Sequence, residues 1–397
     1  MTLLQVLLLV PAVLLAIPVA VLLLQAFAAG SPSRARGGAA AGVVRPRAAV
    51  LVPAHNEAGG IAESLAAVKA QLRPGDRLLV VADNCSDDTA AIAAAAGAEV
   101  VRRHDVERRG KGYALDFGVR HLAADPPQVL VMLDADCLLH EGGLERLVTR
   151  CAALGRPVQA LYLMRARPGA GLRERTAEFA WRVKNQLRPL GALRLGAPCQ
   201  LMGTGMAFPW PLIAGAPLAS GHLVEDMKLG IDLALAGRAA RFEPQALVTS
   251  RFPVAGAATT RQRTRWEHGH IATLLHDGPR LLARGLARGD GSCVALALDL
   301  MVPPLALLLG LVLALALLEV VLGWALLGLA VPALVSAAVL VALAAAVLLA
   351  WARVGRDLLS LRELACAPFY AAAKLPIYLA FLIGRQVEWV RAKRDGE

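Results

Sequence analysis

The chain has 397 residues, of which 57% are apolar and another 36 are glycine, while only 18% are charged. Soluble domains hold about 45–50% apolar residues with glycine included, and about 25% charged residues. This composition excludes an intrinsically disordered chain and argues against a purely soluble globule. The formal net charge is nevertheless +11. We therefore expect a membrane protein that carries one sizeable water-soluble domain.

The first apolar segment, residues 1–29, contains no charged side chain and is long enough to form a transmembrane helix. A cleaved signal peptide is the alternative, because Ala26-Phe27-Ala28 loosely fits a cleavage site. Such peptides need a positive N-terminal region, which is missing here. The basic residues instead follow the segment, in a linker over residues 30–47 that holds Arg34, Arg36, Arg45 and Arg47. The positive-inside rule then predicts an uncleaved anchor that leads the chain into the cytoplasm.

Short apolar runs alternate with helical patterns after residue 48, which predicts an α/β domain with a doubly wound, mostly parallel sheet. Asn56 is expected to cap a helix with Ile61, Leu65 and Val68 on its buried face. Later helices are expected over 90–96 and 113–122, and Gly97 ends the first of these. The strands are expected at residues 48–53, 77–82, 98–101 and 129–133.

Polar residues follow three of these strands: His55-Asn56-Glu57, Asp83-Asn84 and Asp134-Ala135-Asp136. Ligands of doubly wound sheets bind beyond the carboxyl ends of the strands, so these residues predict one shared site. A lone Asp in such a position is usually a helix cap or a turn residue. In Asp134-x-Asp136, however, two carboxylates can approach one centre, and hard oxygen ligands suit Mg²⁺ or Mn²⁺ bridging a diphosphate.

Lys111 lies between two glycines in Arg109-Gly110-Lys111-Gly112. It is either a cation that meets phosphate oxygens or a solvated loop lysine. A GxxxxGK[ST] loop is absent, and so is GxGxxG after the first strand, which leaves ATPase, GTPase and dinucleotide functions without support.

Two further motifs lie downstream. Glu225-Asp226 precedes a helix expected over 227–236, so either carboxylate is a helix N-cap or a general base. Gln262-Arg263-Thr264-Arg265-Trp266 gathers arginines beside a tryptophan. This second motif is typical of a basic helix at a membrane surface, or of a site that holds a phosphate.

The C-terminal third is again apolar. A basic interfacial segment over 277–292 leads into residues 293–352, long enough for two transmembrane helices that turn near 319–323. Residues 353–397 comprise an amphipathic stretch, a last apolar segment over 365–384 and a basic tail. Lys374 lies near the middle of that apolar segment, and a central lysine costs about 2.5–3.5 kcal/mol on insertion scales. An interfacial segment and a fourth span therefore both stay open.

In chain order, Asp83, Asp134-x-Asp136, Glu225-Asp226 and Gln262-x-x-Arg265-Trp266 resemble the motifs of the membrane-embedded family 2 glycosyltransferases. That family includes cellulose, chitin and hyaluronan synthases and ceramide glucosyltransferases. The resemblance covers about residues 48–276 and implies a cytoplasmic GT-A glycosyltransferase domain there. One position departs from the pattern, because Val224 stands before Glu225-Asp226 where many synthases have threonine.

The resemblance also implies roles for individual residues. Asp134 contacts the donor and, with Asp136, the metal ion, while Lys111 assists at the diphosphate. Asp226 is the general base beside Glu225. Gly203-Thr204-Gly205-Met206 is similar to an acceptor-side loop of the family, or else is a glycine-rich turn. The nucleoside, usually uridine, is held by Pro53, His55, Glu57 and Asp83, and the diphosphate and acceptor are covered by Gln262, Arg263, Arg265 and Trp266.

This assignment predicts an inverting, metal-dependent hexosyltransferase of the inner membrane, multi-pass, with Mg²⁺ or Mn²⁺ as cofactor. It would move a sugar from a UDP-sugar to a lipid-linked or glycolipid acceptor, in exopolysaccharide or glycolipid synthesis. A processive polysaccharide synthase is the alternative. A membrane binding or transport protein, whose acidic loops are merely caps, is the hypothesis from another class. Nucleic-acid binding lacks the expected basic and aromatic platform.

Overall fold

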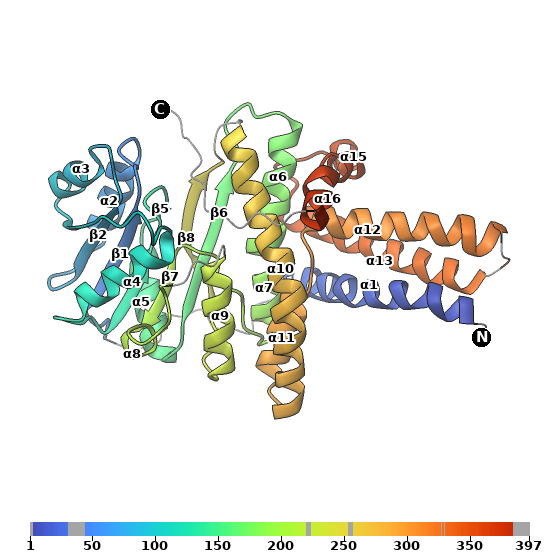
Figure 1. Cartoon of the computed structure of the whole chain (residues 1–397), viewed down its shortest axis with the longest axis horizontal. Coiled ribbons are helices and arrows are strands. Elements are labelled where there is room, and N and C mark those ends of the chain that lie inside the picture. Colours follow the sequence, from blue (N-terminus) through green and yellow to red (C-terminus); the bar gives the residue numbers. More distant parts are fainter. Residues whose placement is uncertain are drawn as a thin grey trace. The chain divides into compact units, whose positions relative to one another are not determined.

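The computed structural model describes residues 3–30, 44–219, 224–252, 257–326, 328 and 330–383 (Figure 1). The chain divides into two compact units. Among the described residues, the sheet unit comprises 44–165, 198–219, 224–252 and 257–266, and the helical unit comprises 3–30, 166–197, 267–326, 328 and 330–383.

The sheet unit is built on one eight-stranded sheet in the order β3-β2-β1-β4-β7-β6-β8-β5. Strands β1 to β4 run parallel to one another, whereas β7 is antiparallel to both β4 and β6. The strands are β1 (Ala48–Ala54), β2 (Arg77–Asp83), β3 (Glu99–Arg103), β4 (Val129–Met132), β5 (Leu138–Leu139), β6 (Val158–Arg165), β7 (Met206–Pro209) and β8 (Arg241–Arg251).

The parallel half of this sheet confirms the predicted α/β class and the first four predicted strands. The continuous apolar runs of β1, β2 and β4 are buried, as expected for strands covered on both faces. The other half makes the sheet mixed, and the sequence analysis did not predict it. Two of its strands, β5 and β7, have only two and four residues, too few to show a periodic pattern.

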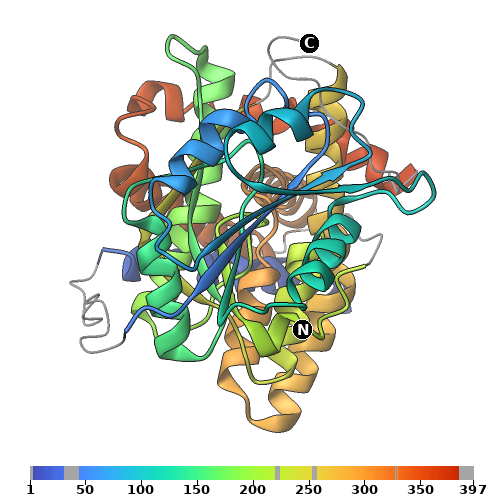
Figure 2. The same ribbon diagram turned by 90° about the vertical axis from the view of Figure 1, so that its left-hand side faces the viewer.

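Helices cover both faces of the parallel half. The chain moves from β1 out to β3 and then returns to β4 on the other side of β1. Right-handed crossovers therefore place the returning helix on the face opposite the first two, as Figure 2 shows. These helices are α2 (Ile61–Lys69) and α3 (Thr89–Ala95) on one face, and α4 (Lys111–Leu122) on the other; α5 (Gly143–Leu154) follows β5. The strand order reverses between β1 and β4, which is where such sheets bind ligands.

Two predicted helix starts are wrong. Asn56 does not cap α2, which begins at Ile61 after Gly60; Asn56 instead adopts a left-handed backbone with φ 54°. Asn tolerates this region, which lets the chain turn sharply after β1. The predicted buried face of Ile61, Leu65 and Val68 is correct. Glu225 and Asp226 are likewise not caps, because they form the first turn of α9 (Glu225–Leu235) after Val224.

In the helical unit, α1, α12 and α13 lie side by side (Figure 1). Leu22, Leu308 and Leu343, from these three helices, are fully or almost fully buried in one core with Phe179 and Leu187. The elements are α1 (Leu3–Ala28), α6 (Leu172–Arg182), the π-helix η1 (Val183–Leu187), α7 (Arg188–Arg194), α11 (Gly291–Leu300), α12 (Leu305–Leu318), the π-helix η2 (Glu319–Leu326) and α13 (Ala330–Val354). The short α8 (Trp210–Ile213) belongs to the sheet unit, and α10 (Ala257–Arg288) carries residues of both units.

Three helical stretches are long and apolar enough to cross a membrane: Gln5–Ala28, Ala330–Val354 and Leu361–Phe381. Gly291–Leu300 and Leu305–Val321 form a further pair, bent by 74°. The predicted turn near 319–323 is misplaced, since the helix continues as η2 to Leu326. The length of an apolar segment predicts how many membrane-spanning helices it can form. It does not predict the residue at which the chain turns between them.

Polar side chains hold the helical unit together at one buried point. Asp299 of α11 accepts hydrogen bonds from Gln25 of α1 at 2.8 Å and from Arg188 of α7 at 2.8 Å. All three residues are buried. This cluster joins three segments that are far apart in the sequence.

Part of the predicted basic linker belongs to the fold instead. The Arg45 side chain is buried and pairs with Asp76 at 2.8 Å and with Glu145 at 3.1 Å. Arg47 pairs with Asp125 at 2.7 Å. These two cations therefore fix the start of β1. Arg34 and Arg36 lie outside the described residues.

Candidate active site

The loops after β1 and β2 are tied to each other. His55 Nδ1 lies 2.7 Å from the carbonyl oxygen of Asp83, and the Glu57 amide donates to Thr89 Oγ1 at 2.7 Å. Asn56 Oδ1 accepts from the Ser86 amide at 2.7 Å. These bonds bring together the predicted nucleoside residues His55, Glu57 and Asp83. Pro53, the fourth, lies in the β1–β2 ladder opposite Val81.

Asp83 has a partner that the sequence analysis missed. Arg103 Nη1 donates to Asp83 Oδ1 at 2.6 Å, and both side chains are about 9% exposed. The two residues face each other in the β2–β3 register. If the two predicted strands are aligned in parallel so that their carboxyl ends match, Arg103 lies opposite Asp83. This alignment could have predicted the ion pair from the sequence.

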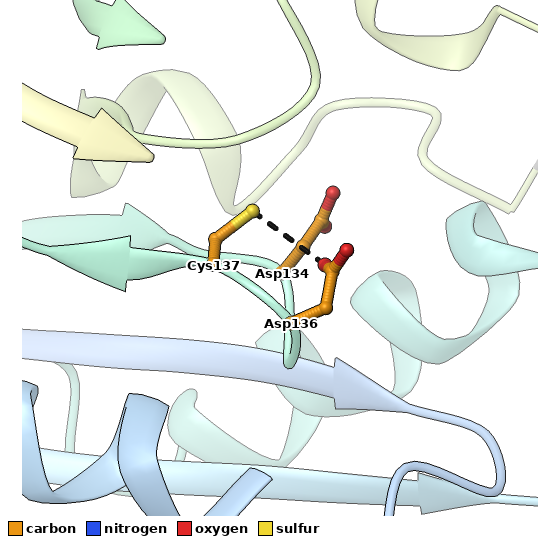
Figure 3. A group of neighbouring side chains, drawn as sticks. All are labelled: Asp134, Asp136 and Cys137. Carbon is orange, nitrogen blue, oxygen red and sulfur yellow. Dashed lines mark hydrogen bonds between the residues drawn. The ribbon is translucent and has the colours of Figure 1, made fainter. Parts of the chain in front are cut away.

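Asp134 and Asp136 follow β4 and point the same way, with the sulfur of Cys137 directed toward them from one side (Figure 3). These three residues are the one group among the described residues whose His, Cys or acidic ligand atoms cluster as in a metal site, all within 4.8 Å of one another. Burial and the neighbouring carboxylates raise the pKa of the Cys137 thiol well above its usual range. Cys137 Sγ donates to Asp136 Oδ1 at 3.5 Å. The available ligands are therefore the two carboxylates, which suit a hard cation such as Mg²⁺ or Mn²⁺.

Lys111 lies at the centre of the acidic residues. Its Nζ is 2.5 Å from Asp134 Oδ1 and donates to the carbonyl oxygen of Gly203 at 2.8 Å. Burial alone would lower the pKa of this ammonium, but the charges of Asp134, Glu225 and Asp226 outweigh burial and raise it. Lys111 is thus permanently charged and not a solvated loop lysine.

Glu225 and Asp226 project from the first turn of α9 toward the same point. Burial raises the pKa of Glu225 to about 7; Lys111 opposes this rise, and the Asp226 charge adds to it. Asp226 Oδ2 lies 3.4 Å from the place that a Cβ atom on Gly203 would occupy. A carboxylate with a pKa near neutrality is suited to proton transfer.

The loop of Gly203 is held by residues outside the predicted motifs. Gln159 of β6 is fully buried; it donates to the Thr204 carbonyl at 2.9 Å and accepts from the Met202 amide at 2.8 Å. Thr204 Oγ1 in turn accepts from the Asp134 amide at 3.0 Å. The loop therefore connects the two-aspartate motif to α9. In the sequence, Gln159 is a polar residue within the largely apolar strand β6, and this could have indicated that it binds the Gly203 loop.

Helix α10 carries the last predicted motif. Burial lowers the pKa of Arg265, and this effect is opposed by the charges of Glu225, Asp226 and Asp134. Its Nε is buried and has no hydrogen-bond partner among the described residues. Trp266 is half-buried. The side chains of Gln262 and Arg263 lie outside the described residues.

A narrow pocket adjoins the carboxylates of α9. Residues of α9, most of them charged, line one side, and residues of α4, β4, β7 and the segment between α8 and α9 line the rest. The lining residues are Gly112, Leu115, Met132, Met206, Pro217, Leu218, Glu225, Asp226, Lys228, Leu229 and Asp232.

The sequence profile described as "Glycosyltransferase like family 2" matches residues 46–269, which is more than half of the chain. The chain belongs to this glycosyltransferase family. Enzymes of this type use nucleotide sugars as donors. The hypothesis of a binding or transport protein with merely structural acidic loops therefore loses its support.

Curated relatives agree with this family. An uncharacterized glycosyltransferase of Mycobacterium tuberculosis is 35% identical over 192 residues, covering 44% of this chain and 81% of the relative. The low-salt glycan biosynthesis hexosyltransferase Agl6 of Haloferax volcanii is 37% identical over 98 residues, covering 24% of this chain and 22% of Agl6.

Among solved structures, the mannosyltransferase PcManGT of Pyrobaculum calidifontis, in complex with GDP-mannose and Mn²⁺, has a TM-score of 0.53 at 22% identity. The match covers 95% of this chain and 96% of PcManGT. At this identity the likeness shows the fold, which confirms the GT-A class of this glycosyltransferase.

Proposed function

We propose that this glycosyltransferase transfers one hexose, with inversion, from a UDP-sugar to a lipid-linked or glycolipid acceptor at the cytoplasmic face of the inner membrane. The central observation is the position of Lys111, which contacts Asp134 and interacts electrostatically with both Glu225 and Asp226. Donor-binding and proton-accepting groups thus meet at one point.

The charges around that point fit a metal–diphosphate complex. The carboxylates of Asp134, Glu225 and Asp226 interact with two cations, Lys111 and Arg265. A fourth carboxylate, that of Asp136, lies beside Asp134. A divalent cation held by Asp134 and Asp136 would balance this excess and stabilise the charge that develops on the leaving diphosphate. Lys111 and Arg265 would bind the phosphate oxygens directly.

The chemistry then needs one displacement. Asp226 accepts the proton of an acceptor hydroxyl, and the oxygen attacks the anomeric carbon from the face opposite the nucleoside diphosphate. The new glycosidic bond forms as the bond to the diphosphate oxygen breaks, so an α-linked donor yields a β-linked product. His55, Glu57 and Asp83 would hold the nucleoside, and the hydrogen bonds between the loops after β1 and β2 support this assignment.

The membrane acceptor is supported by the helical unit. Three apolar helical stretches, and a fourth bent pair, are long enough to span a bilayer. A polymer-conducting channel usually needs more membrane helices than one such chain offers, which favours the addition of a single sugar.

The test uses the purified full chain in lipid nanodiscs with a panel of UDP- and GDP-sugars, membrane lipid extracts and Mg²⁺ or Mn²⁺. We expect nucleoside diphosphate release and one new glycolipid by mass spectrometry, both abolished by EDTA and by Asp226→Asn. The partly exposed Asp116 of α4, which pairs with Arg120 at 2.8 Å, is changed to Asn as the matched control and should retain activity. A ladder of products would identify a processive synthase, and the absence of release with every donor would reject the proposal.

A further inference from the structure

The last apolar segment of the described chain packs against α10. It consists of α14 (Leu361–Leu364), α15 (Ala367–Ala372) and α16 (Leu375–Ile383), which we call the C-terminal strap. We propose that this strap docks on α10 without crossing the membrane, and that its contacts with Glu267 position the helix that carries Arg265 and Trp266.

The Glu267 carboxylate receives two hydrogen bonds from the strap. Lys374 Nζ donates to Oε1, and the Tyr378 hydroxyl donates to Oε2 at 3.0 Å. The Lys374 ammonium also lies 5.4 Å from the centre of the Tyr370 ring. Tyr378 is only 8% exposed. Both oxygens of Glu267 are therefore engaged by side chains of the strap.

The next residue of α10 makes a second pair of contacts. His268 Nε2 lies 2.8 Å from the carbonyl oxygen of Ile377, and the ring meets Phe381 edge to face at 5.2 Å. His268 is 1% exposed. Two consecutive residues of α10 thus bind one turn and a half of α16, and a rotation of either helix would break both sets of contacts.

The strap is apolar enough to span a membrane, but its lysine pairs with a charged residue of α10, a helix that is not itself a candidate span. Turns interrupt it at residues 365–366 and 373–374, and Lys374 lies in the second turn. The partner of Lys374 is α10, which carries charged residues from Glu267 to Arg288 and is not among the candidate spans. Phe369, Leu375 and Leu379 are exposed. Apolar side chains beside a paired lysine are typical of a helix lying in the membrane interface.

Glu267 directly follows Trp266 on one continuous helix, α10. Fixing Glu267 and His268 therefore fixes the rotation of that helix about its own axis, and with it the directions of Arg265 and Trp266. Neither Glu267 nor Lys374 is among the groups assigned to the substrates, so both are positioning residues. This positioning role rests on the proposed function, whereas the docking of the strap does not.

A charge exchange tests the proposal. Glu267→Lys and Lys374→Glu should each lower kcat by about tenfold to a hundredfold, with a smaller change in donor KM, because small misplacements of substrate-positioning groups have effects of this size. The double variant should recover most of the kcat. Arg362→Met is the matched control, since it removes an exposed cation from the same strap and should leave kcat unchanged.

Two readouts are independent of catalysis. The thermal unfolding midpoint of the full chain should fall in each single variant and recover in the double variant. A green fluorescent protein fused to the C-terminus should fluoresce, and alkaline phosphatase fused there should be inactive, as for a cytoplasmic end. An active phosphatase fusion, or a double variant no better than the single ones, would overturn the docking. If the thermal midpoint falls in the single variants and recovers in the double variant while kcat is the same in all of them, the positioning role would be overturned. Inactivity of the unaltered chain with every donor would reject the proposed function alone.

Discussion

Lys111 determines the electrostatics of the candidate site. Without its charge, Asp134, Glu225 and Asp226 would repel one another in a half-buried region, and the Glu225 pKa would rise further. The residue thus offsets part of the repulsion among these carboxylates. If a donor diphosphate binds Lys111 as proposed, it would compete with Asp134 for the same ammonium, and donor and metal binding would then be coupled.

The raised pKa of Glu225 predicts a pH-dependent stability. Its pKa is about 7 in the folded chain against 4.5 for an ordinary glutamate, so the folded state binds the proton more tightly. Stability is therefore lost as the pH rises from about 4.5 to 7. Glu225→Gln should remove about 1–3 kcal/mol of this loss. The thermal midpoints of the unaltered chain and of Glu225→Gln at pH 5 and pH 8 measure this effect. If the difference between the two pH values is the same for both proteins, the raised pKa of Glu225 is contradicted.

Arg103 is predicted to matter for donor binding although it belongs to no motif. Arg103→Met leaves the Asp83 carboxylate without its cation, at a side chain only about 9% exposed. Breaking such a pair costs about 3–5 kcal/mol. We expect a lower unfolding midpoint and a higher donor KM. Arg102→Met is the control, because Arg102 is exposed on the other face of β3 and should change neither.

At the scale of elements, the loop between α7 and β7 links the two acidic motifs. Gly203 has φ +88°, and a Cβ atom there would contact Asp226 and Lys111. Gly203→Ala should cost about 1–2 kcal/mol through the backbone and also lower kcat. Gly142→Ala introduces a similar backbone strain at φ +72° with no neighbour within 4 Å. Equal kcat values for the two variants would show that the loop does not position the acidic groups.

The sequence predicted those elements whose pattern is local. Strands β1, β2 and β4 are continuous apolar runs, β3 contains a shorter one, and helices separate them, so their identity and parallel arrangement follow from periodicity. The strands β5 and β7 are too short for that, and they pair with partners far along the chain. The hydrogen bonds of Gln159 and the ion pair of Arg103 likewise depend on which strands become neighbours. The acidic motifs were predictable because strand ends in a doubly wound sheet converge on one edge.

At the scale of the whole molecule, the cluster of Gln25, Arg188 and Asp299 is predicted to hold the helical unit together. Arg188→Met leaves Asp299 buried without its cation and should cost about 3–5 kcal/mol. The double variant Arg188→Met/Asp299→Leu should recover much of that loss, because it also removes the carboxylate. Thermal unfolding of the full chain in detergent measures both. A double variant as unstable as the single one would show that the cluster contributes by more than charge pairing.

The same cluster has a consequence for how the protein is made. Gln25 and Asp299 are 274 residues apart in the sequence, yet they form a direct hydrogen bond. At about 5–20 residues per second, a ribosome needs on the order of tens of seconds to cover that distance. During this time α1 exists without the helices that bury its polar residue, while the whole sheet unit is being synthesised. The buried hydrogen bond of the first helix therefore cannot form until α11 has been synthesised.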